Sequence, residues 1–193
     1  ERPKDTTDAT AEFLAWSPTD TFHRPERFGV IAFAGSPENV DFSHYRPGSD
    51  GSPTFMINAG AWRIQDGMYE GRNCSETGWF PRGATLGDET WKDYTLKIRY
   101  RLLSRGSDWR DGFWVGFRQG EAGCYALLFT SQDVQLHKVP ASGDYNGDLQ
   151  KLVAVPYTPD TEWHNLTVRV RGGKIEVEQD GKPLIEYTDE KPL

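Results

Sequence analysis

Alternation of apolar and polar residues at every second position is the feature that most constrains how this chain folds. It recurs between glycine-containing turns from Phe55 onward, in segments such as "DYTLKIRYRLL" and "WHNLTVRVR". When the pattern repeats every two residues, one face of each segment points towards a core and the other face points outside, which is typical of β-strands. Helical spacing hardly appears, so the pattern predicts an all-β protein.

Turn residues separate these strands at short intervals. Gly172-Gly173 and Asp180-Gly181 each predict a tight hairpin, because such pairs tolerate the positive φ that a two-residue turn requires. Many short strands at a spacing of roughly 8 to 12 residues predict a two-sheet antiparallel jelly-roll sandwich. We expect residues 28–193 to form this single domain and residues 1–27 to form an N-terminal arm.

The end of the sequence leaves one edge to be explained. The chain stops at "YTDEKPL", directly after a predicted strand, and an uncovered last strand exposes unpaired backbone groups. Either a strand at 28–33 covers this edge, or the domain lacks a C-terminal closing strand in this sequence.

Charge and composition narrow the classes of partner. The formal net charge is −7, and both nucleic acids and anionic membranes are bound through clustered Lys and Arg. No run approaches the roughly 18 apolar residues of a membrane helix. We therefore expect neither nucleic-acid binding nor membrane insertion. The two cysteines, Cys74 and Cys124, permit one disulfide without establishing it.

One strand carries an aromatic side chain and a guanidinium on the same face. In "DGFWVGFRQ", inward Val115 and Phe117 leave Trp114 and Arg118 outside, with Gly116 as open space between them. Sugars are held in this way, by an aromatic plate and by fixed donors. The alternative is a tryptophan covered by a loop and an arginine paired with a surface carboxylate.

Further candidates extend this predicted face. Trp109 lies close by in sequence, and Arg99 and Arg101 are outward residues of the strand in "DYTLKIRYRLL". Gln135 and His137 share a face of "VQLHKV", and this pair resembles a motif of alginate-lyase-like enzymes. There the amide neutralises a uronate carboxylate and the imidazole takes a proton. The alternative is a solvent-facing polar pair.

Carboxylates offer weaker candidates for two kinds of site, the paired acids of a glycoside hydrolase and the ligands of a Ca²⁺ ion. Glu176 and Glu178 share a strand face, but Arg169 and Arg171 lie across the predicted hairpin, and charge pairing is the simpler interpretation. The loop "SGDYNGDL" places oxygen ligands for Ca²⁺ at alternate positions, although the same residue types form ordinary turns. The candidate metal ligands are Asp144, Asn146 and Asp148. No cofactor is required by any motif.

The order of several segments resembles a known family. These segments are "WRIQDGMYEG", "WKDYTLKIRYRL", "GFWVGFR", "GCYALLF", "VQLHKV", "WHNLTVRV" and "IEVEQDGK". Over about residues 55–193 they resemble concanavalin A-like sandwich domains, most of all the 3-keto-disaccharide hydrolase domains and the related laminin-G-like carbohydrate-binding modules.

The resemblance implies a jelly roll whose concave outer face handles sugars, in exported bacterial proteins that process glycans, outside the cell or in the periplasm. It departs from the family at Ala126, where many members carry an acidic or polar residue. We therefore predict carbohydrate recognition, by a binding module or by the sugar-recognising part of a larger protein. The alternatives are a glycoside hydrolase or polysaccharide lyase acting on an oxidised or uronic sugar, and a structural or protein-contact domain.

Overall fold

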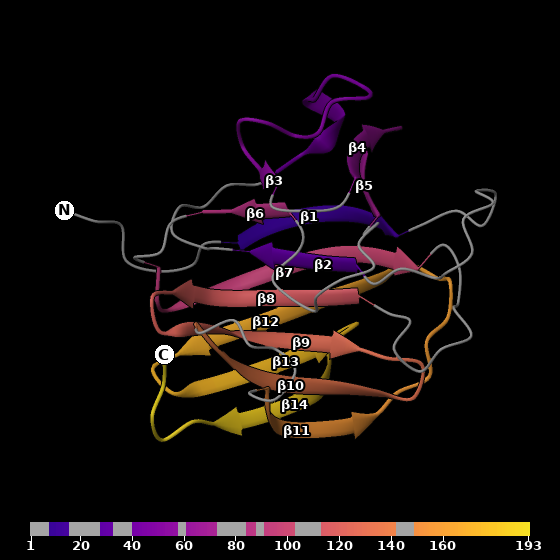
Figure 1. Ribbon diagram of the computed structural model, residues 1–193. Helices are drawn as coiled ribbons and strands as arrows, with labels where there is room; N and C mark the ends of the chain where they lie inside the picture. The colour runs from indigo at the N-terminus through magenta and orange to yellow at the C-terminus, as the bar shows by residue number, and fades with distance from the viewer. Residues whose placement is uncertain are drawn as a thin grey trace.

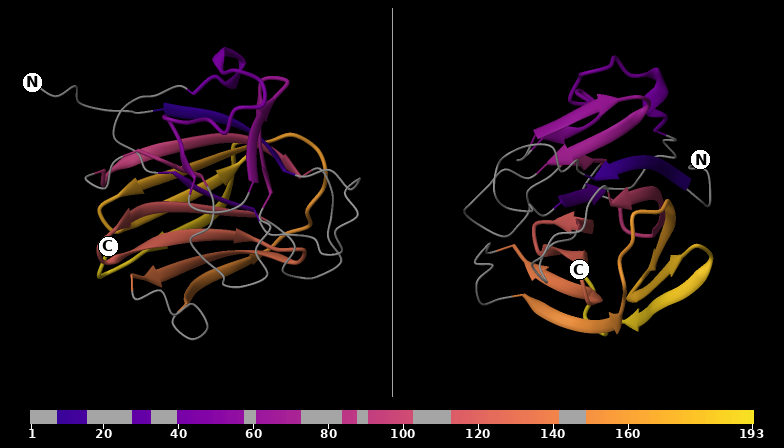
Figure 2. Two further views of the ribbon diagram at one scale, coloured as in Figure 1. Left: turned by 45° about the horizontal axis from the view of Figure 1, so that its top comes forward. Right: turned by 90° about the vertical axis from the view of Figure 1, so that its right-hand side faces the viewer.

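The computed structural model describes residues 8–15, 28–32, 40–57, 61–72, 84–87, 91–102, 113–141 and 149–193 (Figure 1). Two seven-stranded sheets pack face to face, which the view along the strands in Figure 2, right, shows as two layers. The predicted all-β two-sheet sandwich is confirmed. No helix in the described ranges is long and apolar enough to cross a membrane.

Sheet A has the strand order β14-β13-β12-β7-β1-β5-β4. Its strands are β1 (Asp8–Ala15), β4 (Ala61–Gln65), β5 (Met68–Arg72), β7 (Tyr94–Leu102), β12 (His164–Arg171), β13 (Lys174–Gln179) and β14 (Lys182–Thr188).

Sheet B has the strand order β11-β10-β9-β8-β2-β6-β3. Its strands are β2 (Phe28–Ala32), β3 (Met56–Ile57), β6 (Ala84–Leu86), β8 (Phe113–Gly120), β9 (Gly123–Phe129), β10 (Asp133–Pro140) and β11 (Gln150–Pro156). A short 3-10 helix, η1 (Phe42–His44), precedes β3.

Two N-terminal strands lie inside the sheets rather than at their edges. β1, which falls in the predicted arm, pairs in parallel with β7 on one side and with β5 on the other. β2 pairs in parallel with β8 and β6. The sandwich therefore combines antiparallel hairpins with two strands, β1 and β2, that each run parallel to both of their neighbours.

The core lies between the two sheets, as the alternation predicts. The inward residues of β7 are all buried: Tyr94, Leu96, Ile98, Tyr100 and Leu102. They meet inward residues of sheet B such as Val115, Phe117 and Leu136. The side chains between those positions therefore point away from the core, and their sheet decides on which side of the molecule they lie.

At one side of the sandwich, the edge strand of sheet A meets the edge strand of sheet B. β11 and β14 are edge strands of their sheets, and they lie next to each other at the bottom of Figure 1. β2 sits far from this edge, between β8 and β6 in sheet B, so it does not cover β14 as one alternative supposed. Contact with β11 is what protects this side.

The predicted hairpins are present. β12 and β13 are joined through Gly172-Gly173, and β13 and β14 through Asp180-Gly181, whose two residues both have positive φ. Arg169 pairs with Glu178, 2.6 Å from nitrogen to oxygen. Glu176 pairs with Lys174 instead of an arginine. Both carboxylates are thus engaged in charge pairs on the outside of sheet A.

Candidate functional site

The outer faces of the two sheets differ in character. The outward side chains of β7 in sheet A include Lys97, Arg99 and Arg101, each partly exposed. Outward side chains of β8, β9 and β10 in sheet B form a second buried apolar cluster, separate from the main core: Trp114, Cys124, Ala126, Leu128 and Val139. The outer side of β8–β10 is therefore buried, whereas the outward cationic side chains of β7 are partly exposed.

Arg99 and Arg101 do not share a face with Trp114. They belong to β7 in sheet A, whereas Trp114 belongs to β8 in sheet B, and the core separates the two outer faces. Their guanidinium groups lie over the ring of Trp163, at 4.7 and 5.1 Å from its centroid. The single predicted surface is therefore wrong: alternation assigns a side chain to the outside, but not to one of the two outsides.

Arg118 is also not on the predicted face. It has a φ of 51°, and the pairing of β8 with β9 shifts register between Phe117 and Gly120. Its backbone N–H donates to the hydroxyl of Tyr94, and its side chain donates to the Lys92 carbonyl at 2.7 Å and to Asp93 at 2.8 Å. The bulge turns the buried guanidinium towards sheet A, where it joins the two sheets.

Trp114 lies on the predicted face, but it is not an exposed plate. Only 2% of the residue is exposed, because it packs in the second apolar cluster. Its ring lies 6.4 Å from that of His137, centroid to centroid, with the planes 29° apart. Trp114 and His137 therefore lie together on the outside of sheet B.

Gln135 and His137 are on β10, with Val134 and Leu136 turned into the core on either side. Both are buried, at 7% and 6% exposed, so the predicted shared face is present and the solvent-facing alternative is wrong. Gln135 Nε2 lies 2.8 and 3.0 Å from the two carboxylate oxygens of Asp133. Gln135 Oε1 lies 2.8 Å from His137 Nε2. The amide is thus engaged on both sides and is not free to neutralise a uronate.

This line of three side chains determines which nitrogen of His137 carries the proton. A carboxylate only accepts hydrogen bonds, so the NH₂ of Gln135 must face Asp133 and the amide oxygen must face His137. That oxygen also only accepts, so His137 Nε2 must be the donor. In the neutral ring, Nδ1 is then an acceptor with a free lone pair.

Nδ1 of His137 is buried and has no hydrogen-bond partner among the described residues. Burial lowers the pKa of His137 to about 4, and the charge of Lys151 on β11 acts in the same direction. Asp133 opposes these effects. The imidazole is therefore neutral near pH 7, and it presents an unused acceptor on the outer face of sheet B.

Small residues lie beside His137 in the sheet. The register places His137 next to Ala126 of β9, and Ala126 next to Gly116 of β8. Neither residue has a side chain larger than a methyl group. Ala126, the position at which the sequence departs from the resembled family, therefore places only a methyl group beside His137 on the β9 side, while Lys151 is its neighbour on the β11 side.

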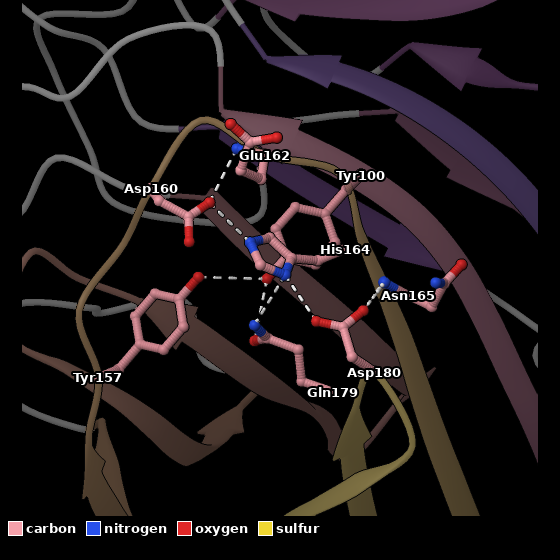
Figure 3. Close-up of polar contacts among 8 residues, drawn as sticks. All are labelled: Tyr100, Tyr157, Asp160, Glu162, His164, Asn165, Gln179 and Asp180. Atoms are coloured by element: carbon pink, nitrogen blue, oxygen red, sulfur yellow. Dashed lines mark hydrogen bonds and ion pairs between the residues drawn. The ribbon is translucent and has the colours of Figure 1, made fainter.

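A second polar cluster lies at one end of the sandwich, and the sequence analysis missed it (Figure 3). His164 Nε2 is 2.8 Å from Asp160, and Nδ1 is 2.7 Å from Asp180. Burial alone would lower the pKa of His164, but hydrogen bonds to Asp180 and Asp160 outweigh it and raise this pKa. The sequence signal was a histidine at the start of one strand and an aspartate in the turn that closes the next hairpin.

The backbone contacts of this cluster indicate a structural clamp. Asp180 accepts from the backbone N–H of Asn165, and Asp160 from that of Glu162, at 2.8 Å each. Both ring nitrogens of His164 have carboxylate partners, unlike Nδ1 of His137. The cluster thus fastens the segment before β12 to the β13–β14 turn.

Several predicted residues lie outside the described ranges: Trp109, Cys74, Asp144, Asn146 and Asp148. Across the described part of the chain, no three His, Cys, Asp or Glu side chains gather as metal ligands would. Cys124 is a free buried cysteine, and burial raises the pKa of its thiol to about 12.

Comparisons with known proteins bear on the family. An extracellular exo-alpha-L-arabinofuranosidase of Streptomyces chartreusis is 26% identical over 145 residues, which make up 74% of this chain but 16% of that enzyme. The carbohydrate binding module CBM66 from Bacillus subtilis aligns with a TM-score of 0.49 at 12% identity, over 74% of this chain and 84% of the module.

The model of one protein family covers most of the chain. It describes the 3-keto-alpha-glucoside-1,2-lyase-like domain and matches residues 39–193, from just before η1 to the last residue. This span holds all but two strands of the sandwich, and it includes the whole line Asp133, Gln135 and His137. The chain therefore belongs to the family of 3-keto-alpha-glucoside-1,2-lyase-like domains, the 3-keto-disaccharide hydrolase domains that its sequence resembles.

Proposed function

We propose that this domain recognises a sugar unit of a glycan on the outer face of sheet B, around Trp114 and His137. The observation that carries the proposal is the buried Nδ1 of His137, a lone-pair acceptor without a partner among the described residues. Buried polar groups are nearly always hydrogen-bonded, so such an atom is suited to a ligand donor. Sugar hydroxyls supply donors, and sugar C–H faces suit aromatic surroundings such as Trp114.

Family membership supports this assignment, because the family is named for glycosides. The Streptomyces relative is an extracellular enzyme named for arabinofuranosides, and this chain spans 16% of its length. These relations support a sugar-recognising part of a larger, exported glycan-processing protein, with an oligo- or polysaccharide as the partner.

The test is a glycan-array screen of the purified domain, with and without added Ca²⁺, repeated on two variants. His137→Gln keeps a donor for Gln135 Oε1 but removes the imidazole acceptor. It is expected to lose about tenfold in affinity, the order of one good hydrogen bond. Arg101→Ala, on the outside of sheet A, is the matched control and is expected to bind as the unmodified protein does.

Thermal melting of both variants separates binding from folding. Retained melting with lost binding in His137→Gln supports the proposal. Unchanged binding in His137→Gln, or lost binding in Arg101→Ala, contradicts it and moves the ligand to another face. A requirement for added Ca²⁺ would revive Asp144, Asn146 and Asp148 as metal ligands.

A second candidate function is cleavage of a 3-keto glycoside, and the lone pair of His137 Nδ1, which has no partner among the described residues, favours it. The low pKa of this ring makes it a weak base, so this function ranks second. A ketone at C3 acidifies the C2–H bond, so Nδ1 can accept that proton. The C2–H electron pair then forms the C1=C2 double bond, the glycosidic C1–O bond breaks, and the leaving oxygen takes up a proton.

Product analysis distinguishes the two functions. The domain is incubated with methyl 3-keto-α-glucoside, and methanol and the unsaturated ketone are followed by mass spectrometry. Products from the unmodified protein, but not from His137→Gln, make it an enzyme. Glycan binding without product from this substrate leaves it a recognition module.

A further inference from the structure

We infer that Gln135 is a positioning residue that fixes His137 as its Nε2–H tautomer, so that the site takes a neutral sugar hydroxyl at Nδ1 and rejects a carboxylate there. This inference rests on the proposed function for its ligand. Its structural part, the fixed tautomer, is independent of any ligand.

The geometry sets the tautomer through one chain of donors and acceptors. Asp133 is itself held in place, since Thr130 donates its hydroxyl to Asp133 Oδ1 at 2.6 Å. Both carboxylate oxygens of Asp133 then accept hydrogen bonds from the amide nitrogen of Gln135. A flipped amide would set its oxygen against two carboxylate oxygens, so the orientation of Gln135 is fixed by repulsion as well as by bonding.

The chemistry of the ligand follows from what Nδ1 offers. An unprotonated ring nitrogen accepts a hydrogen bond from a hydroxyl, whereas a carboxylate would bring a second set of lone pairs against it. To bind a carboxylate, His137 must first take up a proton. With its pKa at about 4, this costs about a thousandfold in affinity at neutral pH before any gain from the new ion pair.

The charges near His137 do not supply an alternative buried anchor for an anion. Asp133 has the same sign as a uronate, and Lys151, the cross-strand neighbour of His137, is exposed. Gln135 offers its donors to Asp133 rather than outward. Among the described residues, the buried part of this face thus presents an acceptor to the ligand.

The first test reads the tautomer directly. Protein labelled with ¹⁵N-histidine is measured at pH 7 by long-range ¹H–¹⁵N NMR, and His137 is assigned by the signal that His137→Gln lacks. We expect the shift of an unprotonated nitrogen at Nδ1 and of a protonated nitrogen at Nε2. A protonated Nδ1, or averaged shifts from both tautomers, would overturn the inference.

Two variants of Gln135 show whether this residue sets the tautomer. Gln135→Met keeps the length of the side chain but removes the acceptor, and averaged tautomers are expected. Gln135→Glu keeps an acceptor for Nε2–H, so the Nε2 proton is expected to remain, although the new carboxylate faces Asp133 and should lower the stability of the fold. If Gln135→Met also keeps the single Nε2–H tautomer, Gln135 has no positioning role. A residue that merely filled space would not change these shifts.

The second test concerns the ligand. Glycans that bind the array in a manner sensitive to His137→Gln are expected to be neutral at the bound unit, with a uronic acid in its place weakening binding by about tenfold or more. A uronate bound as tightly as its neutral counterpart contradicts the carboxylate rejection. If no glycan binds, the proposed function fails, while the NMR result still decides the tautomer.

Discussion

His137 and His164 show how one residue type acquires opposite properties in one small domain. Burial lowers the pKa of His137, whose ring has only the amide of Gln135 as a hydrogen-bond partner among the described residues, to about 4. For His164, burial is outweighed by two carboxylates, and its pKa is raised. The pairing of His137 with Gln135 follows from the alternation within β10, but the burial of His137 and the contact of His164 with Asp180 depend on the packing of distant segments and cannot be read from the local sequence.

The unusual pKa of His137 predicts a loss of stability in acid. Its folded pKa of about 4 lies below the value of about 6.5 for an unfolded histidine, so the unfolded chain binds the proton first. Stability is therefore lost as pH falls from the unfolded pKa towards the folded one. Between pH 7 and about pH 5 the unmodified protein should lose about 2 kcal/mol more than His137→Gln.

Urea unfolding of both proteins at the two pH values measures this difference. Groups distant from His137 cancel in the comparison, whereas the effects of Asp133 and Lys151 on His137 are part of the difference that is measured. If both proteins lose the same unfolding free energy between the two pH values, the pKa of His137 is not lowered by folding, which contradicts the prediction.

His164 predicts the opposite dependence. Its pKa is raised in the folded state, so its contribution to stability is present below the unfolded pKa and is lost as pH rises through the folded pKa. Relative to His164→Gln, the unmodified protein should lose stability between about pH 6 and about pH 8. Unfolding at these two pH values checks the sign, and a parallel loss in the variant would contradict it.

At the scale of elements, the β8–β9 hairpin shows where alternation succeeds and where it fails. It correctly turns Val115 and Phe117 inward and Trp114 outward. It fails at Arg118, since the register shift between Phe117 and Gly120 interrupts the period of two. A bulge depends on the pairing partner, so no pattern within one strand predicts it.

The same hairpin gives a matched pair of glycine variants. Gly123 has a φ of 129°, and a methyl group there would overlap the carbonyl oxygen of Val139 on β10. Gly123→Ala should therefore lose about 3 kcal/mol or more of unfolding free energy, from steric overlap and backbone strain. Gly120 has open space around it, and Gly120→Ala should change stability by about 1 kcal/mol at most.

Urea unfolding of the two variants tests the hairpin geometry. Both substitutions add one methyl group within the same pair of residues, Gly120 and Gly123, so chemistry and location are controlled. Similar losses in the two variants would mean that β9 does not approach β10 as closely as described.

At the scale of the whole molecule, the sequence predicted the class of fold but not the place of its first strands. Short turns and alternation predict the antiparallel hairpins from β8 onward, because consecutive strands pair locally. β1 and β2 pair in parallel with distant strands. Pairing at such separation leaves no local signal, which is also why Arg99 and Trp114 were assigned to one surface instead of two.

The position of β1 and β2 predicts the result of shortening the chain. The family model begins at residue 39, but β1 separates β7 from β5 and β2 separates β8 from β6. Residues 39–193 alone should therefore lose cooperative unfolding and associate through the strand edges left open. Circular dichroism melts and size-exclusion chromatography test this, and a monomeric, cooperatively melting fragment would contradict it.

Cys124 belongs with Trp114 to the second apolar cluster, and burial raises the pKa of its thiol to about 12. The rate at which this thiol reacts therefore reports how often the outer side of sheet B opens. A thiol reagent in solution can reach it only during the moments when the outer layer of sheet B opens. The rate of thiol modification measures the frequency of that opening, and a ligand that holds the layer closed lowers this rate.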